Sequence, residues 1–358
     1  SVFRPFLLCY DNDNQTRKGD YRMSKPSVFI TRKMVPDVIE NLKKQFEVRI
    51  WDSEEDAVPP EILLEEAKKV DALFITISDK IDYSLIEQAE NLKVIANMAV
   101  GYDNIDVEAA NSKGIAVCNT PDVLTDTTAD FTFALLMATA RRIGEGAETV
   151  KRGNWQSWSP LLLAGHDIHH KTLGIVGMGE IGEAVAKRSL GFEMEILYHN
   201  RSRKPVAEQQ LGAVYCRFEE LLERSDYVVC MTPLTDETEN MFDTGAFKRM
   251  KDSAIFINTS RGRVVDEDAL HKALVQREIA GAGLDVFTIE PIGSDHPLIS
   301  LPNVLATPHI ASSSIETRIE MMTLCSENIS RILTGRKPKT LVNKEWLSAK
   351  EDFGGLSN

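Results

Sequence analysis

The sequence predicts an α/β protein built from two doubly wound parallel β-sheets, each covered by helices on both faces. Short apolar runs alternate with amphipathic stretches from Ser27 onward, as is typical of β-α units in a parallel sheet. One long helical stretch, over residues 125–152, interrupts this alternation, which starts again at Leu173. A length of 358 residues agrees with two domains.

The first series of elements extends to residue 118. Pro60 stands at the start of a helical stretch, where its missing N–H costs no hydrogen bond. We expect strands at 28–30, 46–51, 72–77, 92–98 and 115–118, and helices at 35–45, 60–70, 84–89 and 107–113.

The second series follows the stretch 125–152, which has few helix breakers before Gly144 and is expected to form a single helix. A further long helix is expected at 315–333, and the polar tail from Trp346 is expected to fray. Between them we expect strands at 173–176, 195–198, 227–231, 254–258, 283–286 and 304–306, and helices at 183–190, 218–224 and 266–276.

Residues 1–22 stand outside this pattern. The stretch from Met23 to Pro26 leads directly into the first apolar strand and is typical of a natural start. The preceding residues are polar and aperiodic, and their one apolar run, Phe6 to Leu8, is too short for the core of a signal peptide. We expect this segment to be either a mis-set start, lying ahead of the natural first residue, or a disordered extension, and in both cases to take no part in the fold.

The composition limits the classes of function. Hydrophobic residues make up 43% and charged residues 27% of the chain, which is ordinary for a soluble globular protein. No run of 18 apolar residues occurs, so no membrane-spanning helix is expected. The formal net charge of −13 argues against a nucleic-acid or anionic-membrane partner.

The cysteines and histidines predict neither a disulfide framework nor a metal site. The five cysteines are scattered and form no CxxC pair, which agrees with a reducing cytoplasm. Three histidines, His166, His169 and His170, lie close in sequence, but only Asp167 stands near them as a further ligand.

A glycine motif, Gly177-Met178-Gly179-Glu180-Ile181-Gly182, follows an apolar strand and opens a helix. In a dinucleotide-binding turn the first glycine permits the tight turn, the second lets the backbone approach the pyrophosphate, and the third lets helix and strand pack closely. The helix N-terminus then faces the anion. The alternative is a glycine-rich turn without a ligand.

The residues after the next strand predict the choice of cofactor. An acidic side chain at this position would bind the ribose of NAD. The chain instead has Asn200, followed by Arg201, Ser202 and Arg203, which could accept a 2′-phosphate. We therefore expect NADP(H) to be preferred, with NAD(H) as the second cofactor. The alternative is a solvated basic loop.

Three residues far apart in sequence suit hydride transfer to a 2-keto acid. Arg261, Glu290 and His309 each follow a predicted strand, where ligands bind in doubly wound sheets. A guanidinium binds a carboxylate through two hydrogen bonds, and an imidazole can protonate a carbonyl oxygen. A carboxylate holds the imidazole and favours its charged form. Taken singly, each residue also has a purely structural explanation.

At these residues the chain resembles the D-isomer-specific 2-hydroxyacid dehydrogenases, and among them most the glyoxylate/hydroxypyruvate reductases. The resemblance covers about residues 27 to 340. Besides the glycine motif and the three residues, it includes the segments 99–106, 119–130, 232–235, 258–262, 283–286 and 308–309.

The resemblance implies a role for each matching residue. Arg261, Glu290 and His309 correspond to the catalytic triad, and the amides of Val100 and Gly101 to the loop that holds the substrate carboxylate. Trp158 lies in a loop that in the reductases closes the site of the other subunit. The implied cofactor-binding residues are Thr128, Gly177, Gly179, Glu180, Ile181, Gly182, Asn200, Arg201, Ser202, Arg203, Thr232, Pro233, Thr238, Thr259, Ser260, Arg261, Asp285, His309 and Ala311.

The resemblance also implies two Rossmann-like domains with a discontinuous substrate domain. Residues 23–121 and 307–343 would form the substrate domain, residues 122–306 the dinucleotide-binding domain, and residues 344–358 a tail. It further implies a homodimer that reduces a small 2-keto acid such as glyoxylate or hydroxypyruvate. No metal is implied.

Three alternatives share this fold. A 3-phosphoglycerate-type dehydrogenase commonly carries a C-terminal regulatory domain, whereas this chain is expected to end in one helix and a tail. Formate dehydrogenases have glutamine where this chain has Glu290. A non-enzymatic corepressor of this fold binds NAD(H) and peptides and can keep the triad, so the residues alone leave it open.

Overall fold

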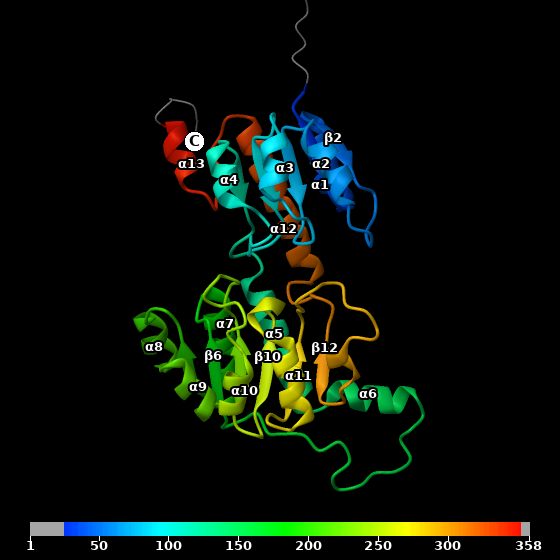
Figure 1. Cartoon of the computed structure of the whole chain (residues 1–358), viewed down its shortest axis with the longest axis vertical. Coiled ribbons are helices and arrows are strands. Elements are labelled where there is room, and N and C mark those ends of the chain that lie inside the picture. The colour runs from blue at the N-terminus through cyan, green and yellow to red at the C-terminus, as the bar shows by residue number, and fades with distance from the viewer. Residues whose placement is uncertain (1–24, 352–358) are drawn as a thin grey trace, which may run out of the picture.

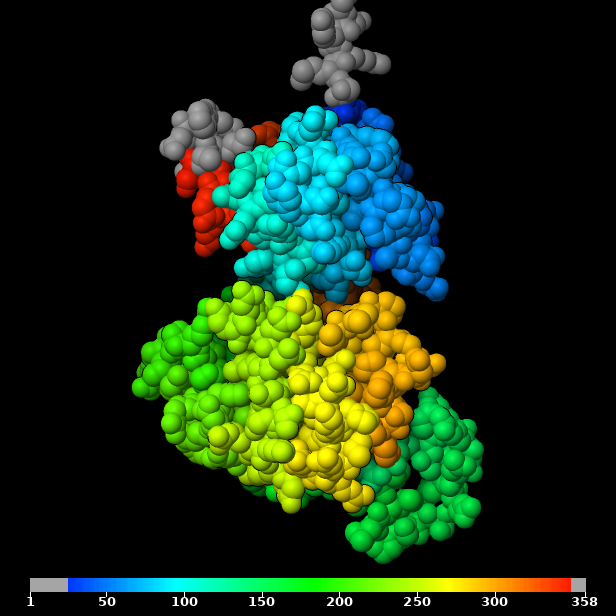
Figure 2. All heavy atoms as spheres, viewed as in Figure 1, coloured from blue at the N-terminus to red at the C-terminus, as the bar shows by residue number. Residues whose placement is uncertain are grey.

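The computed structural model describes residues 25–351, and the expected N-terminal extension lies outside the described residues. The chain folds into two lobes, each built around a parallel β-sheet (Figure 1). Figure 2 shows the two lobes meeting along a narrow waist. The predicted fold class is confirmed, whereas the exact domain boundaries stay predictions.

The first lobe contains five parallel strands in the order β2-β1-β3-β4-β5. Successive residues of β1 point to opposite faces, because Val28 and Ile30 join one apolar cluster and Phe29 the other. The strands are β1 (Ser27–Ile30), β2 (Glu47–Ile50), β3 (Ala72–Ile75), β4 (Val94–Asn97) and β5 (Ala116–Cys118). The helices are α1 (Pro36–Gln45), α2 (Pro60–Ala67), α3 (Tyr83–Gln88) and α4 (Val107–Ser112).

The second lobe contains seven parallel strands in the order β12-β11-β10-β9-β6-β7-β8, and the direction of winding reverses between β6 and β9. The strands are β6 (Thr172–Val176), β7 (Glu195–His199), β8 (Val214–Tyr215), β9 (Tyr227–Cys230), β10 (Ile255–Asn258), β11 (Gly281–Leu284) and β12 (Val304–Ala306). The helices are α5 (Thr125–Ala140), α7 (Glu180–Ser189), α8 (Pro205–Leu211), α9 (Phe218–Arg224), α10 (Thr244–Arg249) and α11 (Glu267–Val275), with short 3₁₀ helices at Leu190–Phe192, Gly262–Val264 and Pro297–Ser300.

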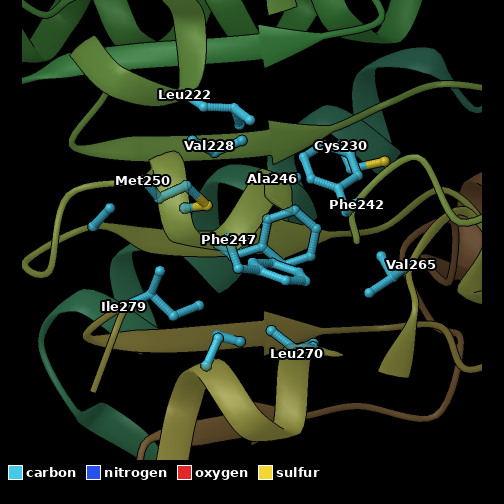
Figure 3. Close-up of a cluster of buried hydrophobic side chains, with 14 of the residues drawn as sticks. Leu222, Val228, Cys230, Phe242, Ala246, Phe247, Met250, Val265, Leu270 and Ile279 are labelled. Atoms are coloured by element: carbon cyan, nitrogen blue, oxygen red, sulfur yellow. The ribbon is translucent and has the colours of Figure 1, made fainter. Parts of the chain in front are cut away.

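Aromatic side chains fill one face of the second sheet. Phe242, Phe247 and Phe256 are fully buried, and the ring centroids of Phe242 and Phe256 lie 4.8 Å apart (Figure 3). On the opposite face, α5 and α7 cover the sheet. Apolar burial on both faces makes the sheet a rigid support for the loops at its carboxyl edge.

Helix α12 (Ile315–Leu333) returns the chain to the first lobe and packs on its sheet through Met321, Cys325 and Ile329. After α12, the side chain of Asn343 holds the chain against β5 through two hydrogen bonds. Its Oδ1 accepts a hydrogen bond from the Val117 N–H, and its Nδ2 donates one to the Ile115 carbonyl, each at 2.9 Å. Residues from both ends of the described chain therefore build the first lobe.

The expected single helix over 125–152 is wrong, because the chain forms α5 and a separate α6 (Ile143–Lys151). The break falls at Arg142, whose φ of 52° is left-handed. The carbonyl of Ala140, the last residue of α5, accepts a hydrogen bond from the N–H of His166 at 2.9 Å. A residue from a later segment therefore satisfies a carbonyl at the end of the helix. Helix α6 and the loop after it project from the lobe as an arm (Figures 1 and 2).

Other elements depart from the expectation in smaller ways. Helices α8 and α10 and the short edge strand β8 were not expected, and β11 begins two residues before the predicted strand. The tail forms helix α13 (Glu345–Glu351) where fraying was expected. Trp346 explains this difference, because its side chain is buried and its indole N–H donates to the Gly114 carbonyl at 2.9 Å.

The described cysteines, Cys118, Cys216, Cys230 and Cys325, are all buried and form no disulfide, while Cys9 lies outside the described residues. Burial raises the pKa of the Cys230 thiol, so this sulfur stays protonated at neutral pH. None of the helices within residues 25–351 combines the length and the apolar character that crossing a membrane requires.

Candidate active site

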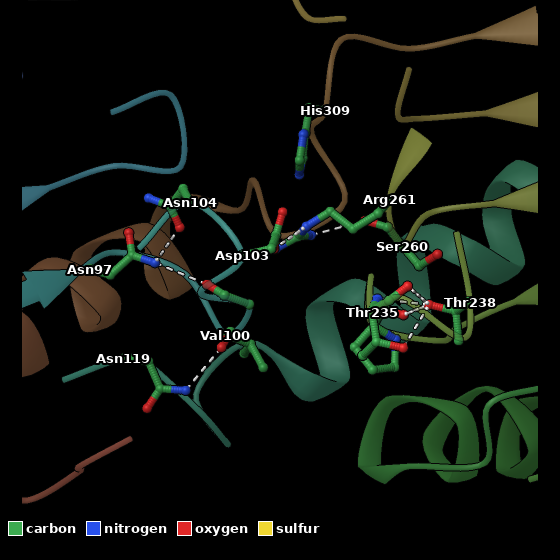
Figure 4. Close-up of polar contacts among 12 residues, drawn as sticks. Asn97, Val100, Asp103, Asn104, Asn119, Thr235, Thr238, Ser260, Arg261 and His309 are labelled. Carbon is green, nitrogen blue, oxygen red and sulfur yellow. Dashed lines mark hydrogen bonds and ion pairs between the residues drawn. The ribbon is translucent and has the colours of Figure 1, made fainter. Parts of the chain in front are cut away.

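A loop of the first lobe presents free backbone amides toward the waist. Asn119 Nδ2 donates to the carbonyl of Val100, and Asn97 Nδ2 donates to the carbonyl of Gly101, both at 2.9 Å (Figure 4). Within residues 25–351, the N–H groups of Val100 and Gly101 donate to no protein acceptor. Two adjacent free amides of this kind can hold a carboxylate.

Arg261 reaches this loop from the second lobe. Its Nε donates to Asp103 Oδ1 at 2.8 Å, and its Nη1 donates to the Ser260 carbonyl at 2.9 Å. A Cβ added at Gly101 would lie 1.8 Å from Arg261 Nη2, so the end of the guanidinium lies directly against Gly101. The guanidinium and the free amides therefore face the same small space.

Asn258, the last residue of β10, supports the backbone that carries Arg261. Its Oδ1 accepts hydrogen bonds from the Ser260 N–H at 3.0 Å and the Ser260 hydroxyl at 2.9 Å. Its Nδ2 donates to the carbonyl of Arg261 at 2.9 Å. Because Asn258 is buried, these bonds fix the turn from which the guanidinium projects.

Glu290 and His309 form a close pair. The distance from His309 Nδ1 to Glu290 Oε2 is 2.7 Å, and Glu290 Oε1 accepts a hydrogen bond from the Phe287 N–H at 2.9 Å. Burial is the largest single influence and acts to raise the pKa of Glu290. The hydrogen bond and charge of His309, the Phe287 N–H and the charge of Arg261 together outweigh burial, so the pKa is lowered. The carboxylate therefore stays ionised, and Nε2 remains the free nitrogen of the imidazole.

Asp285 holds the loop that carries His309. Its carboxylate accepts hydrogen bonds from the Thr307 hydroxyl at 2.6 Å and from the N–H groups of Ile310 and Ala311 at 2.9 and 2.8 Å. Burial raises the pKa of Asp285 despite these bonds. His309 has a φ of 54°, a left-handed conformation that costs energy in residues other than glycine and is imposed here by the loop.

The glycine motif has the geometry of an anion-binding turn. Gly177 has a φ of 101°, and a Cβ there would lie 2.7 Å from the Met231 carbonyl carbon. A Cβ at Gly182 would lie 2.4 Å from the Gly177 carbonyl oxygen. Gly179 faces open space, since no atom lies within 4 Å of its added Cβ. Helix α7 begins at Glu180, next to this open space, and no side chain among the described residues caps its N-terminus. First-turn N–H groups have no partner within their own helix, so the residues fit a bound pyrophosphate.

The basic loop after β7 is more ordered than its sequence suggests. Asn200 Oδ1 accepts from the Met178 N–H at 2.6 Å and its Nδ2 donates to the Met178 carbonyl at 3.1 Å. Arg203 is held by two hydrogen bonds to Glu208, at 3.0 and 2.6 Å. Arg201 is exposed and, in the described part of the chain, forms no hydrogen bond or ion pair.

The other expected cofactor residues lie at the same edge of the second sheet. Thr232 and Pro233 follow β9, and Thr259 and Ser260 follow β10. Thr238 fastens the first of these loops, because its hydroxyl donates to the Pro233 carbonyl at 2.6 Å. On α5, the hydroxyl of Thr128 is buried without a partner among the described residues, as expected of a group that awaits a ligand.

The structure also shows where Trp158 lies and which residues contact the Arg261 segment. Trp158 is 77% exposed and belongs to the loop after α6, which forms part of the arm. Asp103 and Asn258 belong to recognised motifs, but their sequence pattern assigned them no role; only their contacts with the Arg261 segment show one. Within residues 25–351 no three His, Cys, Asp or Glu side chains form a group that could hold a metal.

The NAD-binding-domain model of the D-isomer specific 2-hydroxyacid dehydrogenases matches residues 133–311. A glyoxylate reductase of Thermococcus gammatolerans is 48% identical over 331 residues, which cover 91% of this chain and 98% of the relative. The chain belongs to the D-isomer-specific 2-hydroxyacid dehydrogenases. Membership and the glycine turn together support a nicotinamide dinucleotide as the cofactor.

Solved structures of two other family members agree over most of the chain. A glyoxylate reductase from Paecilomyes thermophila is 32% identical with a TM-score of 0.80, covering 90% of this chain and 100% of that one. An NADPH-dependent glyoxylate/hydroxypyruvate reductase from Sinorhizobium meliloti, in complex with NADP and malonate, is 33% identical with a TM-score of 0.77, covering 90% of this chain and 98% of that one.

Proposed function

We propose that this dehydrogenase reduces a small 2-keto acid, glyoxylate or hydroxypyruvate, to the corresponding D-2-hydroxy acid with NADPH as the preferred reductant. The observation that carries the proposal is the His309–Glu290 pair at 2.7 Å, opposite a guanidinium and two free amides. The names of relatives such as the Thermococcus glyoxylate reductase support the choice of substrate.

The substrate would be oriented by groups from both lobes. The free N–H groups of Val100 and Gly101 bind its carboxylate, and Arg261 Nη2, which lies against Gly101, binds the carboxylate and the carbonyl oxygen. Because the guanidinium is fixed by Asp103 and Ser260, little side-chain freedom is lost on binding.

His309 is the general acid. A reduced nicotinamide held by the glycine turn would supply the hydride for the keto carbon. His309 Nε2 gives its proton to the carbonyl oxygen, so the carbonyl becomes a hydroxyl. Glu290 accepts the Nδ1–H bond and compensates the positive charge of the protonated ring. In the reverse direction the neutral imidazole takes the hydroxyl proton.

The preference for NADP(H) rests on the loop after β7. Asn200 carries no charge that would repel a 2′-phosphate, and its side chain is already engaged with Met178. Arg201 is the cation available for the phosphate, with the Ser202 hydroxyl as a second donor. Arg203 acts mainly through Glu208, which orders the loop.

A homodimer is the proposed assembly. Helix α6 has no buried residue, and the arm exposes large apolar side chains, among them Trp155, Trp158 and Leu161. A cavity of about 1290 Å³ lies between α6 and the edge of the second sheet near Leu305. This concave surface, lined by both apolar and charged side chains, together with the exposed apolar arm, is suited to a second copy, whose site Trp158 would reach. A monomeric mass by light scattering with full activity would contradict this assembly.

The test is NADPH oxidation by the purified protein on addition of glyoxylate, hydroxypyruvate or 3-phosphohydroxypyruvate. We expect turnover with the first two, and His309→Ala should lower kcat by ~10²–10⁴-fold. His169→Ala, which removes an exposed histidine, is the matched control. Turnover of the phosphorylated acid alone favours a 3-phosphoglycerate-type enzyme, whereas cofactor binding without any turnover favours a corepressor.

A further inference from the structure

A carboxylate of the first lobe lies directly beside the guanidinium that the proposed function assigns to the substrate. Asp103 Oδ1 accepts the Arg261 Nε–H at 2.8 Å, and this bond joins two residues 158 positions apart. Figure 4 shows Asp103 between Arg261 and the Val100 loop, with His309 on the opposite side of the same space. An acidic group at an anion-binding site requires an explanation.

We propose that Asp103 is a positioning residue for Arg261 and that its charge restricts the site to 2-keto acids with a single negative charge. This inference rests on the proposed function, because it concerns how Arg261 serves the substrate. It assigns two separable roles to the Asp103 side chain. Its acceptor oxygen orients the Arg261 guanidinium, and its negative charge disfavours substrates that carry a second carboxylate.

The positioning role follows from how the five guanidinium hydrogens are shared. Asp103 takes the Nε–H and the Ser260 carbonyl takes one Nη1–H, so both ends of the planar group are held. The Nη2 edge is thereby directed at Gly101 and its free amide. Without Asp103, the long arginine side chain regains its rotational freedom, and the substrate must order it.

The charge role follows from the environment of the carboxylate. The Asp103 side chain is 34% exposed, and in residues 25–351 its Oδ2 has no hydrogen-bond partner. This oxygen can accept a hydrogen bond from a substrate hydroxyl. A second substrate carboxylate at the same place would meet a like charge, and Arg261 is already neutralised by Asp103.

Hydroxypyruvate and ketomalonate separate the two roles, because they differ by CH₂OH against COO⁻ at one carbon and so mainly in charge. Asp103→Asn keeps an acceptor oxygen for Arg261 and removes the charge. It should keep kcat with hydroxypyruvate within about threefold and improve kcat/KM for ketomalonate relative to hydroxypyruvate by about tenfold, the factor that ~1.4 kcal/mol of repulsion produces. Asp103→Ala removes the acceptor too and should lower kcat about tenfold or more with both acids.

Glu108→Gln removes one exposed negative charge from α4 and is the matched control. It should change neither kcat with hydroxypyruvate nor the kcat/KM for ketomalonate relative to hydroxypyruvate. An unchanged ratio in Asp103→Asn overturns the charge role, and a normal kcat in Asp103→Ala overturns the positioning role. Calorimetry with D-glycerate and tartronate reports the same preference without turnover. A wild type that turns over neither acid would count against the proposed function, while a charge-dependent change in binding would still support the role of Asp103.

Discussion

Replacement of Arg201 by alanine should reduce the preference for NADPH, whereas the same change at Arg203 should not. The Arg203 guanidinium already donates two hydrogen bonds to Glu208, from Nε at 3.0 Å and from Nη2 at 2.6 Å. Arg201 is exposed and lacks a hydrogen-bonded or ion-paired partner among the described residues. A charge-assisted hydrogen bond to a phosphate contributes ~1.5–3 kcal/mol, and solvent exposure favours the lower end. Arg201→Ala should therefore lower kcat/KM for NADPH about tenfold.

The assay is kcat/KM for NADPH and NADH with glyoxylate at a fixed salt concentration. NADH has no 2′-phosphate, so its kcat/KM should stay within about twofold in Arg201→Ala and serves as the internal control. Arg203→Ala loses an exposed ion pair worth ~0–1 kcal/mol and should leave the cofactor ratio within about threefold. An unchanged ratio in Arg201→Ala, or an equal loss in both variants, would refute this reasoning. A wild-type protein with a higher kcat/KM for NADH than for NADPH would contradict the predicted preference for NADPH.

Three further outcomes are expected around the same site. Arg261→Lys keeps the charge but loses the planar fork, so KM for glyoxylate should rise about tenfold or more and kcat should fall; unchanged kinetics would exclude the assigned role. Gly182→Ala places a Cβ 2.4 Å from a carbonyl oxygen and should cost ~1–3 kcal/mol of stability, whereas Gly179→Ala should leave Tm unchanged and raise KM for NADPH. The lowered pKa of Glu290 means that its ionised form stabilises the fold above pH about 4.5 and that this contribution disappears as the pH falls through the lower folded-state pKa. The Tm difference between wild type and Glu290→Gln should accordingly shrink on acidification; a constant difference would be evidence against the pairing with His309.

The strands were predictable because they are short, apolar and separated by amphipathic helices, and a buried parallel sheet requires that pattern. The errors occurred where tertiary contacts override local preference. The end of α5 depends on a hydrogen bond from His166 to Ala140, and nothing in the residues around Arg142 signals it. Trp346 lies in a polar stretch, yet one buried indole holds α13 against the first lobe.

In the site, too, some features could be predicted from the sequence and others depend on tertiary contacts. The glycine turn and the three residues Arg261, Glu290 and His309 could be selected from the sequence because the proposed hydride transfer to a keto acid requires those residue types after strands of such a sheet. The roles of Asp103 and Asn258 could not, because neither residue is chemically distinctive and each acts only through its contact with the Arg261 segment. Similarly, Arg201 and Arg203 are equivalent in sequence, and only Glu208 distinguishes them in the structure.

The sequence by itself determined the two-sheet α/β architecture, the dinucleotide turn and the chemical groups that we propose act on the substrate. These depend on local patterns: periodic burial, glycines where a Cβ would collide, and polar side chains at strand ends. Only the tertiary structure decided which groups are free to act. The carbonyls of Val100 and Gly101 are bound by Asn119 and Asn97, while their N–H groups donate to no acceptor within residues 25–351. Asp103 and Ser260 hold two other nitrogens of Arg261, so its Nη2 is left for a ligand. Hydrogen-bonding capacity is a property of a residue, but whether that capacity is already satisfied depends on neighbours that folding brings from distant parts of the chain.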